Sequence, residues 1–259
     1  MKSRLKHSTL AQSGQTESTP ARPRYLIIDV LRGVAIAMMF HYHFSFDLNH
    51  FGFIEQDFYR DPFWINYRTL IVSLFLGLVG VSLSLASQQR FNPRSYFRRL
   101  GLLIFFAALV SIGSYIQFAD RMIFFGILHF IAVASVLGLA FVRFYWLNLL
   151  LGTGLIILGS QFQHAFFDQP WLQWLGMMTH KPFTEDYAPL LPWFGVVLLG
   201  MFVGKLVFEK HPQLWLQNWH HHDPLSRSLS FAGKHGLIIY MLHQPVFMGL
   251  LYLLSLTIA

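Results

Sequence analysis

Residues 29–47 of the chain read DVLRGVAIAMMFHYHFSFD, an apolar run that contains Asp29, Arg32, His43 and Asp47. An α-helix turns by about 100° per residue, so these four side chains fall on one narrow face. Ionisable groups inside a membrane span are rare because each is costly to place in hydrocarbon, and they usually mark a functional site. The stretch therefore predicts a transmembrane helix with a functional polar face.

The composition of the whole chain is typical of a membrane protein. Of its 259 residues, 54% are hydrophobic and only 12% are charged, and the charges lie in short stretches between long apolar runs. Each run is long enough to cross about 30 Å of hydrocarbon as a helix. We predict an all-α integral membrane protein with a bundle of about seven transmembrane helices. Besides the first segment, the predicted spans are residues 69–89, 100–119, 122–142, 144–167, 187–204 and 236–259.

The distribution of charge predicts the orientation of these spans. Fourteen of the nineteen basic residues lie in the N-terminal segment and in every second connection after it. Eight of the twelve acidic residues, counting Asp47, lie on the other side. Because cytoplasmic connections are enriched in Lys and Arg, we expect the N-terminus in the cytoplasm and the C-terminus outside.

Residues 1–24 are polar, basic and rich in Ser and Thr, which predicts a disordered cytoplasmic tail. No second soluble domain is visible in the sequence, so residues 25–259 are expected to form a single transmembrane domain. The net charge of +7 is explained by the inner face and anionic lipid headgroups, and we predict no nucleic-acid partner. The absence of cysteine excludes disulfides, thiolate metal sites and cysteine nucleophiles. Gly200 and Gly204 predict close helix packing in the sixth span.

Polar residues also occur in or beside the later spans. His129 and His243 each interrupt an apolar run, and they are candidates either for substrate contacts, for haem ligation or for hydrogen bonds between helices. Asp186 and Trp193 lie where the sixth span begins, and Pro245 frees a backbone carbonyl beside His243. No metal site is predicted, because His41 and His43 lie about 200° apart around a helix.

Four stretches of the chain resemble the transmembrane acyltransferases related to heparan-alpha-glucosaminide N-acetyltransferase, in particular their shorter bacterial relatives. The stretches are residues 29–47 (DVLRGVAIAMMFHYHFSFD), 126–132 (GILHFIA), 186–195 (DYAPLLPWFG) and 233–245 (GKHGLIIYMLHQP). The spacing from Arg32 to His43 also looks like the arginine and histidine pair of the wider membrane acyltransferase superfamily. Together the four stretches touch most of the chain after residue 24.

The resemblance implies a reaction, a location and partners. Members of the family take an acyl group from cytoplasmic acyl-CoA and deliver it to an amine or hydroxyl of a sugar on the far side of the membrane. We accordingly expect a multi-pass protein of the bacterial inner membrane that uses acetyl-CoA or another acyl-CoA as co-substrate and holds no bound cofactor. The sugar or glycan acceptor and the lipid bilayer are the other expected partners. The oligomeric state is open, with a homodimer as one alternative.

Arg32 lies near the predicted inner face, where a guanidinium can bind the phosphates of the acyl donor. The alternative interpretation of Arg32 is an ion pair with Asp29 inside the helix. Asp29, Lys234 and His235 belong to the same predicted donor site. The predicted substrate-binding residues are His129, Asp186, Trp193 and His243.

His43 is the first catalytic candidate, as a general base toward the acceptor or as a transient acyl carrier. Asp47, one turn further, is expected to orient its ring, and the alternative is a polar pair near the headgroups. Animal relatives carry an asparagine where His43 aligns and a histidine in the following outer loop, for which His50 is the nearest equivalent here. The catalytic histidine is therefore His43 or His50. Gly236 occupies a position where a serine is expected from the bacterial relatives.

Two other classes of protein remain as alternatives. A transporter or channel would use the charged face to move a solute and would leave a thioester intact. A haem protein would show a Soret band that depends on His129 or His243.

Overall fold

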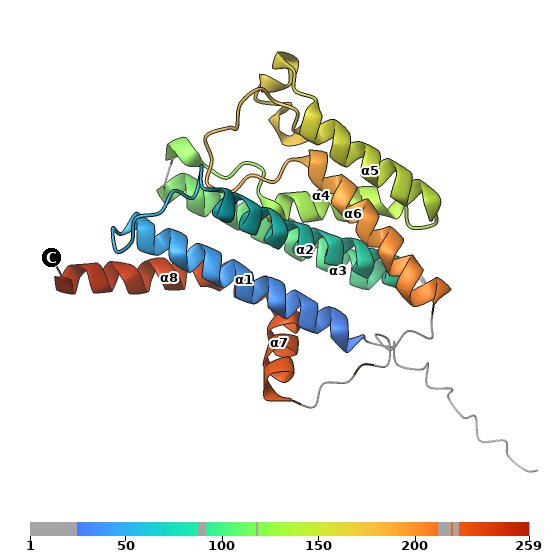
Figure 1. Ribbon diagram of the computed structural model, residues 1–259, viewed down its shortest axis with the longest axis horizontal. Helices are drawn as coiled ribbons and strands as arrows, with labels where there is room; N and C mark the ends of the chain where they lie inside the picture. The colour runs from blue at the N-terminus through green and yellow to red at the C-terminus, as the bar shows by residue number, and fades with distance from the viewer. Residues whose placement is uncertain (1–24, 88–91, 118, 212–218, 220–222, 259) are drawn as a thin grey trace, which may run out of the picture.

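The computed structural model describes residues 25–258 apart from residues 88–91, 118, 212–218 and 220–222. All regular secondary structure in this described part is helical (Figure 1). The predicted cytoplasmic tail, residues 1–24, lies outside the described residues.

Five helices are long and apolar enough to cross a membrane, which confirms the predicted all-α membrane bundle. They are α1 (Leu26–His50), α2 (Pro62–Ser87), α3 (Pro93–Gln117), α6 (Leu190–Lys205) with the π-helical turn η4 (Leu206–Lys210), and α8 (Gly236–Ile258). Three shorter helices accompany them: α4 (Ile127–Leu139), α5 (Trp146–Gln161) and α7 (Pro224–Lys234). Single 3₁₀ turns occur at η1 (Ala119–Arg121), η2 (Ala165–Asp168) and η3 (Gln173–Leu175).

Two of the seven predicted spans are shorter than expected. Helix α4 has 13 residues and α5 has 16. At about 1.5 Å per residue, α4 covers about 20 Å, which is less than the thickness of a typical hydrocarbon core. Both are apolar helices that begin and end inside the predicted apolar runs. Buried Asn148, in the first turn of α5, donates through Nδ2 to the carbonyl oxygens of Phe141 (3.1 Å) and Phe144 (2.5 Å), which stabilises the turn between α4 and α5.

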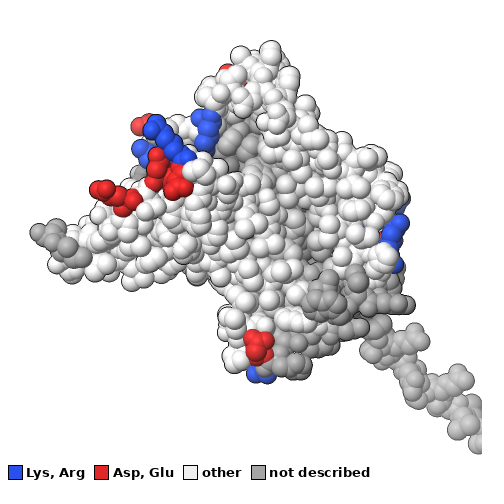
Figure 2. All heavy atoms as spheres, in the orientation of Figure 1, with Lys and Arg blue, Asp and Glu red and all other residues white. Residues whose placement is uncertain are grey.

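The connections lie at two opposite ends of the bundle, in the alternation that the charge pattern predicts. The loops at residues 51–61, 119–126 and 162–189 meet at one end, here called the long-loop end. Contacts there are Arg121 Nη1 with Glu185 Oε1 (3.1 Å) and Lys181 Nζ over the Tyr59 ring (5.7 Å). At the opposite end, here called the α7 end, Lys205 Nζ donates to the Arg143 carbonyl at 3.1 Å. In Figure 2, Lys, Arg, Asp and Glu gather near these two ends and an uncharged surface separates them.

The core is packed most closely where α6 crosses α2. A Cβ on Gly200 would collide with the backbone of Gly77, and one on Gly80 would collide with the Val197 carbonyl. Gly204 approaches the Ser84 side chain. The close packing predicted for Gly200 and Gly204 is therefore confirmed. Buried Leu76, Phe130, Val197, Leu198 and Met201 fill the space between α2, α4 and α6.

Helix α7 was not predicted, because its residues fall in a segment that reads as a basic inner loop. Asp223 begins the helix by accepting a hydrogen bond from the Ser226 N–H (2.8 Å), and Pro224 occupies the first turn. The helix then crosses α1 near the start of α1, while α8 continues beside α1 toward the long-loop end (Figure 1). Helices α7 and α8 thus cover one face of α1.

Candidate active site along helix α1

The polar face of α1 predicted from the sequence packs against α7 and α8. Asp29 and Asp47 are buried, with 4% and 1% of their surfaces exposed, and Arg32 and His43 are partly buried. Arg32 contacts α7, whereas His43 and Asp47 contact α8. The face is therefore the inner surface of a seam between α1 and the C-terminal helices.

Arg32 joins three helices at the α7 end of this seam. Its Nη1 donates to Asp29 Oδ1 (3.1 Å) and to the Gly233 carbonyl of α7 (3.3 Å), and its Nη2 donates to Ser82 Oγ of α2 (3.1 Å). The ion pair that formed the alternative interpretation of Arg32 is thus present. About 28% of the Arg32 side chain is exposed.

The other predicted donor-binding residues lie next to this cluster. Lys234 ends α7 and His235 follows it, and both are exposed. The His235 Nδ1 lies 2.9 Å from the Phe231 carbonyl, which holds the ring against α7. Gly236 packs against Ile36, where a Cβ would lie 3.3 Å from Ile36 Cδ1. The structure therefore brings Asp29, Arg32, Lys234 and His235 to one place.

About three turns along α1, His43 faces His243 of α8. The two ring centroids are 5.0 Å apart with the rings edge to face, and Phe40 stacks on His243 at 5.7 Å. Within the described residues neither ring nitrogen of His43 has a hydrogen-bond partner. His243 Nδ1 lies 2.6 Å from the Tyr240 carbonyl, and its Nε2 is buried without a partner.

Asp47 binds Gln244 and not His43. Gln244 Nε2 donates to Asp47 Oδ1 at 2.7 Å, which connects α8 to α1 one turn beyond the histidine pair. Asp47 Oδ2 and Gln244 Oε1 are both buried and have no partner in the described part of the chain. The hydrogen bond expected from Asp47 to His43 is thus absent among the described residues, and Asp47 Oδ1 accepts from the amide of Gln244 of α8 instead.

Asp186 holds together segments that are distant in the sequence. Its Oδ2 accepts hydrogen bonds from the Ile127 N–H at the start of α4 (2.9 Å) and from the Tyr240 hydroxyl of α8 (3.4 Å). A Cβ on Gly126 would collide with this carboxylate, so the glycine leaves room for it. Burial raises the pKa of Asp186, and the hydrogen bonds from Ile127 and Tyr240 oppose that rise.

His129 has both ring nitrogens bonded to protein groups. The Gly126 N–H donates to Nδ1 (3.3 Å), and Nε2 donates to Ser111 Oγ (3.1 Å), which itself donates to the Ile123 carbonyl (2.6 Å). This arrangement favours the helix-bridging interpretation of His129. Haem ligation through His129 would need a ring nitrogen that these contacts occupy.

Trp193 lies on α6 and packs against the apolar cluster between α2, α4 and α6. It is partly buried, like the other aromatic side chains around that cluster. Its predicted role in substrate binding has no support from these neighbours, since they are hydrophobic.

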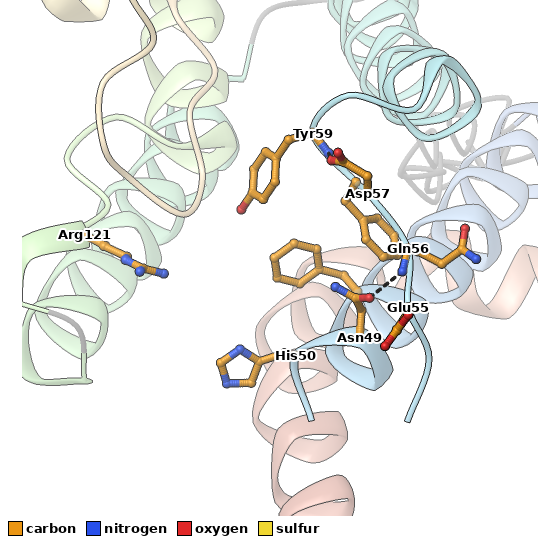
Figure 3. A pocket seen from close by; sticks show the side chains of 9 residues that line it. Asn49, His50, Glu55, Gln56, Asp57, Tyr59 and Arg121 are labelled. Atoms are coloured by element: carbon orange, nitrogen blue, oxygen red, sulfur yellow. Dashed lines mark hydrogen bonds between the residues drawn. The ribbon is translucent and has the colours of Figure 1, made fainter. Parts of the chain in front are cut away.

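An open pocket of about 620 Å³ lies at the long-loop end of α1 (Figure 3). His50 is the last residue of α1, and its ring borders the same space as Tyr59 and Arg121. The Asn49 Oδ1 accepts the Gln56 N–H at 2.7 Å, which holds the loop over the pocket. The pocket is lined by Phe46, Asn49, His50, Glu55, Gln56, Asp57, Phe58, Tyr59 and Arg121.

Sequence reasoning missed three residues of the seam: Ser82, Tyr240 and Gln244. Tyr240 and Gln244 are polar residues in the apolar run that also holds His243, and their spacing puts all three within about one helical turn. That spacing alone indicates that Tyr240 and Gln244 lie close to His243 on α8. Ser82 gave no such signal, because a single serine in a span is common and only the fold brings it to Arg32.

Among the described residues there is no group of three His, Cys, Asp or Glu side chains that could hold a metal ion. No curated protein and no solved structure matches the chain significantly. A sequence model of one family does match, over residues 24–245, and its description is heparan-alpha-glucosaminide N-acetyltransferase, catalytic. The match covers α1 to the first half of α8 and includes the polar residues described along the seam. The chain therefore belongs to the heparan-alpha-glucosaminide N-acetyltransferase family of transmembrane acyltransferases.

Proposed function

We propose that the protein transfers an acetyl or other acyl group from cytoplasmic acyl-CoA to an amine or hydroxyl of a sugar on the extracytoplasmic side of a bacterial inner membrane. The observation that carries the proposal is the order of groups along α1. Arg32 lies at the α7 end, His43 lies in the middle beside His243, and His50 borders the pocket at the long-loop end. Two reactants can thus approach one central site from opposite ends.

The donor is proposed to bind at the α7 end. Arg32, Lys234 and His235 offer positive charge or N–H donors there, and coenzyme A carries several phosphates. Guanidinium groups bind phosphate oxygens with two parallel hydrogen bonds, which suits a charged donor at the mouth of a membrane site. The partial exposure of Arg32 supports such a contact.

The acceptor is proposed to bind in the pocket at the long-loop end. The pocket combines aromatic rings, such as Phe46 and Tyr59, with amide and carboxylate groups, such as Asn49 and Glu55. Aromatic faces pack on the apolar face of a sugar, and the polar groups can bind its hydroxyls. The pocket volume of about 620 Å³ is that of a small-molecule site.

Chemistry is proposed between these two sites. The acceptor amine or hydroxyl attacks the thioester carbonyl, the carbon–sulfur bond breaks, and coenzyme A leaves as the thiol after it receives a proton. His43 is the first candidate for proton transfer, and His50 is the alternative.

Transfer is tested with purified protein in proteoliposomes, with radiolabelled acetyl-CoA on one side and amino sugars on the other. We expect label transfer only when acetyl-CoA reaches the α7 end. His43→Ala should lower kcat by about 100-fold or more, and Arg32→Ala should raise KM for acetyl-CoA. His164→Ala, in the 162–189 loop, is the control and should behave as wild type. Passage of a sugar with an intact thioester would instead identify a transporter.

A further inference from the structure

Within the part of the chain that the structure describes, the seam between α1 and α8 contains three buried hydrogen-bond acceptors without partners. These are His243 Nε2, Asp47 Oδ2 and Gln244 Oε1. Asp47 and His243 are 1% and 6% exposed. An unpaired buried polar atom costs about 1–3 kcal/mol, so native proteins retain few of them, and those found in the interior call for a ligand, a water or a reaction.

The tautomer of His243 follows from its one hydrogen bond. Nδ1 lies 2.6 Å from the backbone carbonyl of Tyr240, and a carbonyl oxygen can only accept. Nδ1 therefore carries the ring proton, and Nε2 of the neutral ring has a free lone pair. His129 differs in this respect, because protein groups occupy both of its ring nitrogens.

The surroundings of His243 hold this lone pair in place. Phe40 stacks on one side of the ring, His43 lies edge to face at 5.0 Å, and the next residue, Gln244, is bound to Asp47 of α1. The remaining acceptors of Asp47 and Gln244 are complementary to a group with several N–H or O–H donors, such as a primary amine or a sugar hydroxyl.

We propose that His243 is a second catalytic histidine, which receives the proton of the acceptor, and that Asp47 and Gln244 position the nucleophile beside it. This proposal rests on the proposed acyl transfer. The acceptor N–H or O–H bond breaks as its nitrogen or oxygen bonds to the acyl carbon, and the proton goes to His243 Nε2. The proton then passes through His43, whose ring lies edge to face with that of His243 at 5.0 Å, to the departing coenzyme A sulfur, so both histidines take part in the transfer.

The two amide replacements of His243 separate its catalytic role from a structural role. In His243→Asn the side-chain amide lies where Nδ1 lies now, so it can still donate to the Tyr240 carbonyl, but no base remains. In His243→Gln the amide lies near the Nε2 position, and the bond to Tyr240 is lost. A purely structural histidine would therefore be replaced well by Asn and poorly by Gln.

The test measures kcat and KM for acetyl-CoA with an amino sugar, in wild type, His243→Asn and His243→Gln. The control is His41→Asn, because His41 lies on α1 two residues before His43 and its side chain is exposed. We expect His243→Asn to fold, to keep the wild-type KM for acetyl-CoA and to lose about 100-fold to 10,000-fold in kcat. His41→Asn should keep the wild-type kcat. Nitrogen NMR of histidine-labelled protein should show the His243 proton on Nδ1.

If His243→Asn keeps the wild-type kcat, or if the proton of the resting His243 ring lies on Nε2, the proposed role of His243 is overturned. Neither result contradicts the proposed acyl transfer. No turnover by folded wild-type protein with any acceptor would overturn the proposed function, and this role of His243 with it. A large loss in kcat for Asp47→Asn with unchanged KM for acetyl-CoA would support the positioning role of Asp47. Unchanged kinetics in that variant would remove Asp47 from the proposal.

Discussion

His129 and His243 are equivalent in the sequence, where each is a histidine inside an apolar run, but they differ in the structure. The ring of His129 is bonded at both nitrogens, whereas one nitrogen of the buried His243 ring has no partner among the described residues. A residue with both nitrogens occupied stabilises the fold, and a residue with a free buried lone pair can take part in chemistry. The distinction depends on three neighbours, Gly126, Ser111 and Tyr240, that no sequence rule assigns.

Asp186 is expected to stabilise the junction of α4, α6 and α8. We predict that Asp186→Ala lowers the free energy of unfolding by about 1–3 kcal/mol, because the Ile127 N–H and the Tyr240 hydroxyl lose their acceptor. Asp186→Asn keeps one acceptor oxygen and should cost less. The measurement is the midpoint of unfolding in detergent, and equal midpoints for the alanine variant and wild type would contradict the role.

The raised pKa of Asp186 also predicts how stability depends on pH. The unfolded carboxyl loses its proton near its usual pKa of 3.8, and the folded one loses it at higher pH. Between these values the folded state binds more protons than the unfolded state, so the free energy of unfolding falls as pH rises. Asn has no carboxyl to titrate, so in Asp186→Asn the unfolding midpoint should fall less as pH rises than it does in wild type. A wild-type midpoint with the same pH profile as that of Asp186→Asn would contradict the prediction.

At the scale of secondary-structure elements, the crossing of α1 and α7 controls the donor side of the site. The two helices approach at Gly33 and Gly233, where a Cβ would collide with the carbonyls of Leu229 and Asp29 respectively. Arg32 lies beside both glycines and donates to the Gly233 carbonyl. The position of Arg32 therefore depends on an approach that only glycine permits.

Gly33→Ala is predicted to push α7 away from α1. We expect a loss of about 1–3 kcal/mol in stability, as for other overpacked interiors, together with a higher KM for acetyl-CoA because Arg32 loses a partner. Gly154→Ala in α5 is the matched control, since a Cβ there meets nothing within 4 Å. Glycine is a poor helix former, so the control should be neutral or slightly stabilised. Equal donor KM values for both variants would contradict the proposed link.

At the scale of the whole molecule, the chain is suited to a direct test of its orientation, because it contains no cysteine. We predict that a single cysteine at Glu55, exposed at the long-loop end, reacts with a membrane-impermeant maleimide in intact cells. A cysteine at Ser228, exposed on α7, should react only after the membrane is opened. The reverse pattern would overturn the predicted topology and, with it, the sidedness of the proposed transfer.

The sequence by itself determined the membrane class, the alternation of the connections and the polar face of α1. These properties depend on hydropathy, on charge bias and on the 3.6-residue period of a helix, all of which are local along the chain. The same local patterns indicated Gly200 and Gly204 as packing positions, which the crossing of α6 and α2 confirms.

Only the tertiary structure decided which polar groups meet. The pairing of Asp47 with Gln244, the hydrogen bonds from Arg32 to Gly233 and Ser82 and the hydrogen bond from Tyr240 to Asp186 each join residues far apart in the sequence. At the same level, the hydrogen bonds from Asn148 and to Asp186 form at the first turns of α5 and α4, inside the apolar runs. Hydrophobicity is a sum over a segment, whereas a hydrogen bond needs two atoms within about 3 Å, and only the packed bundle brings those atoms together.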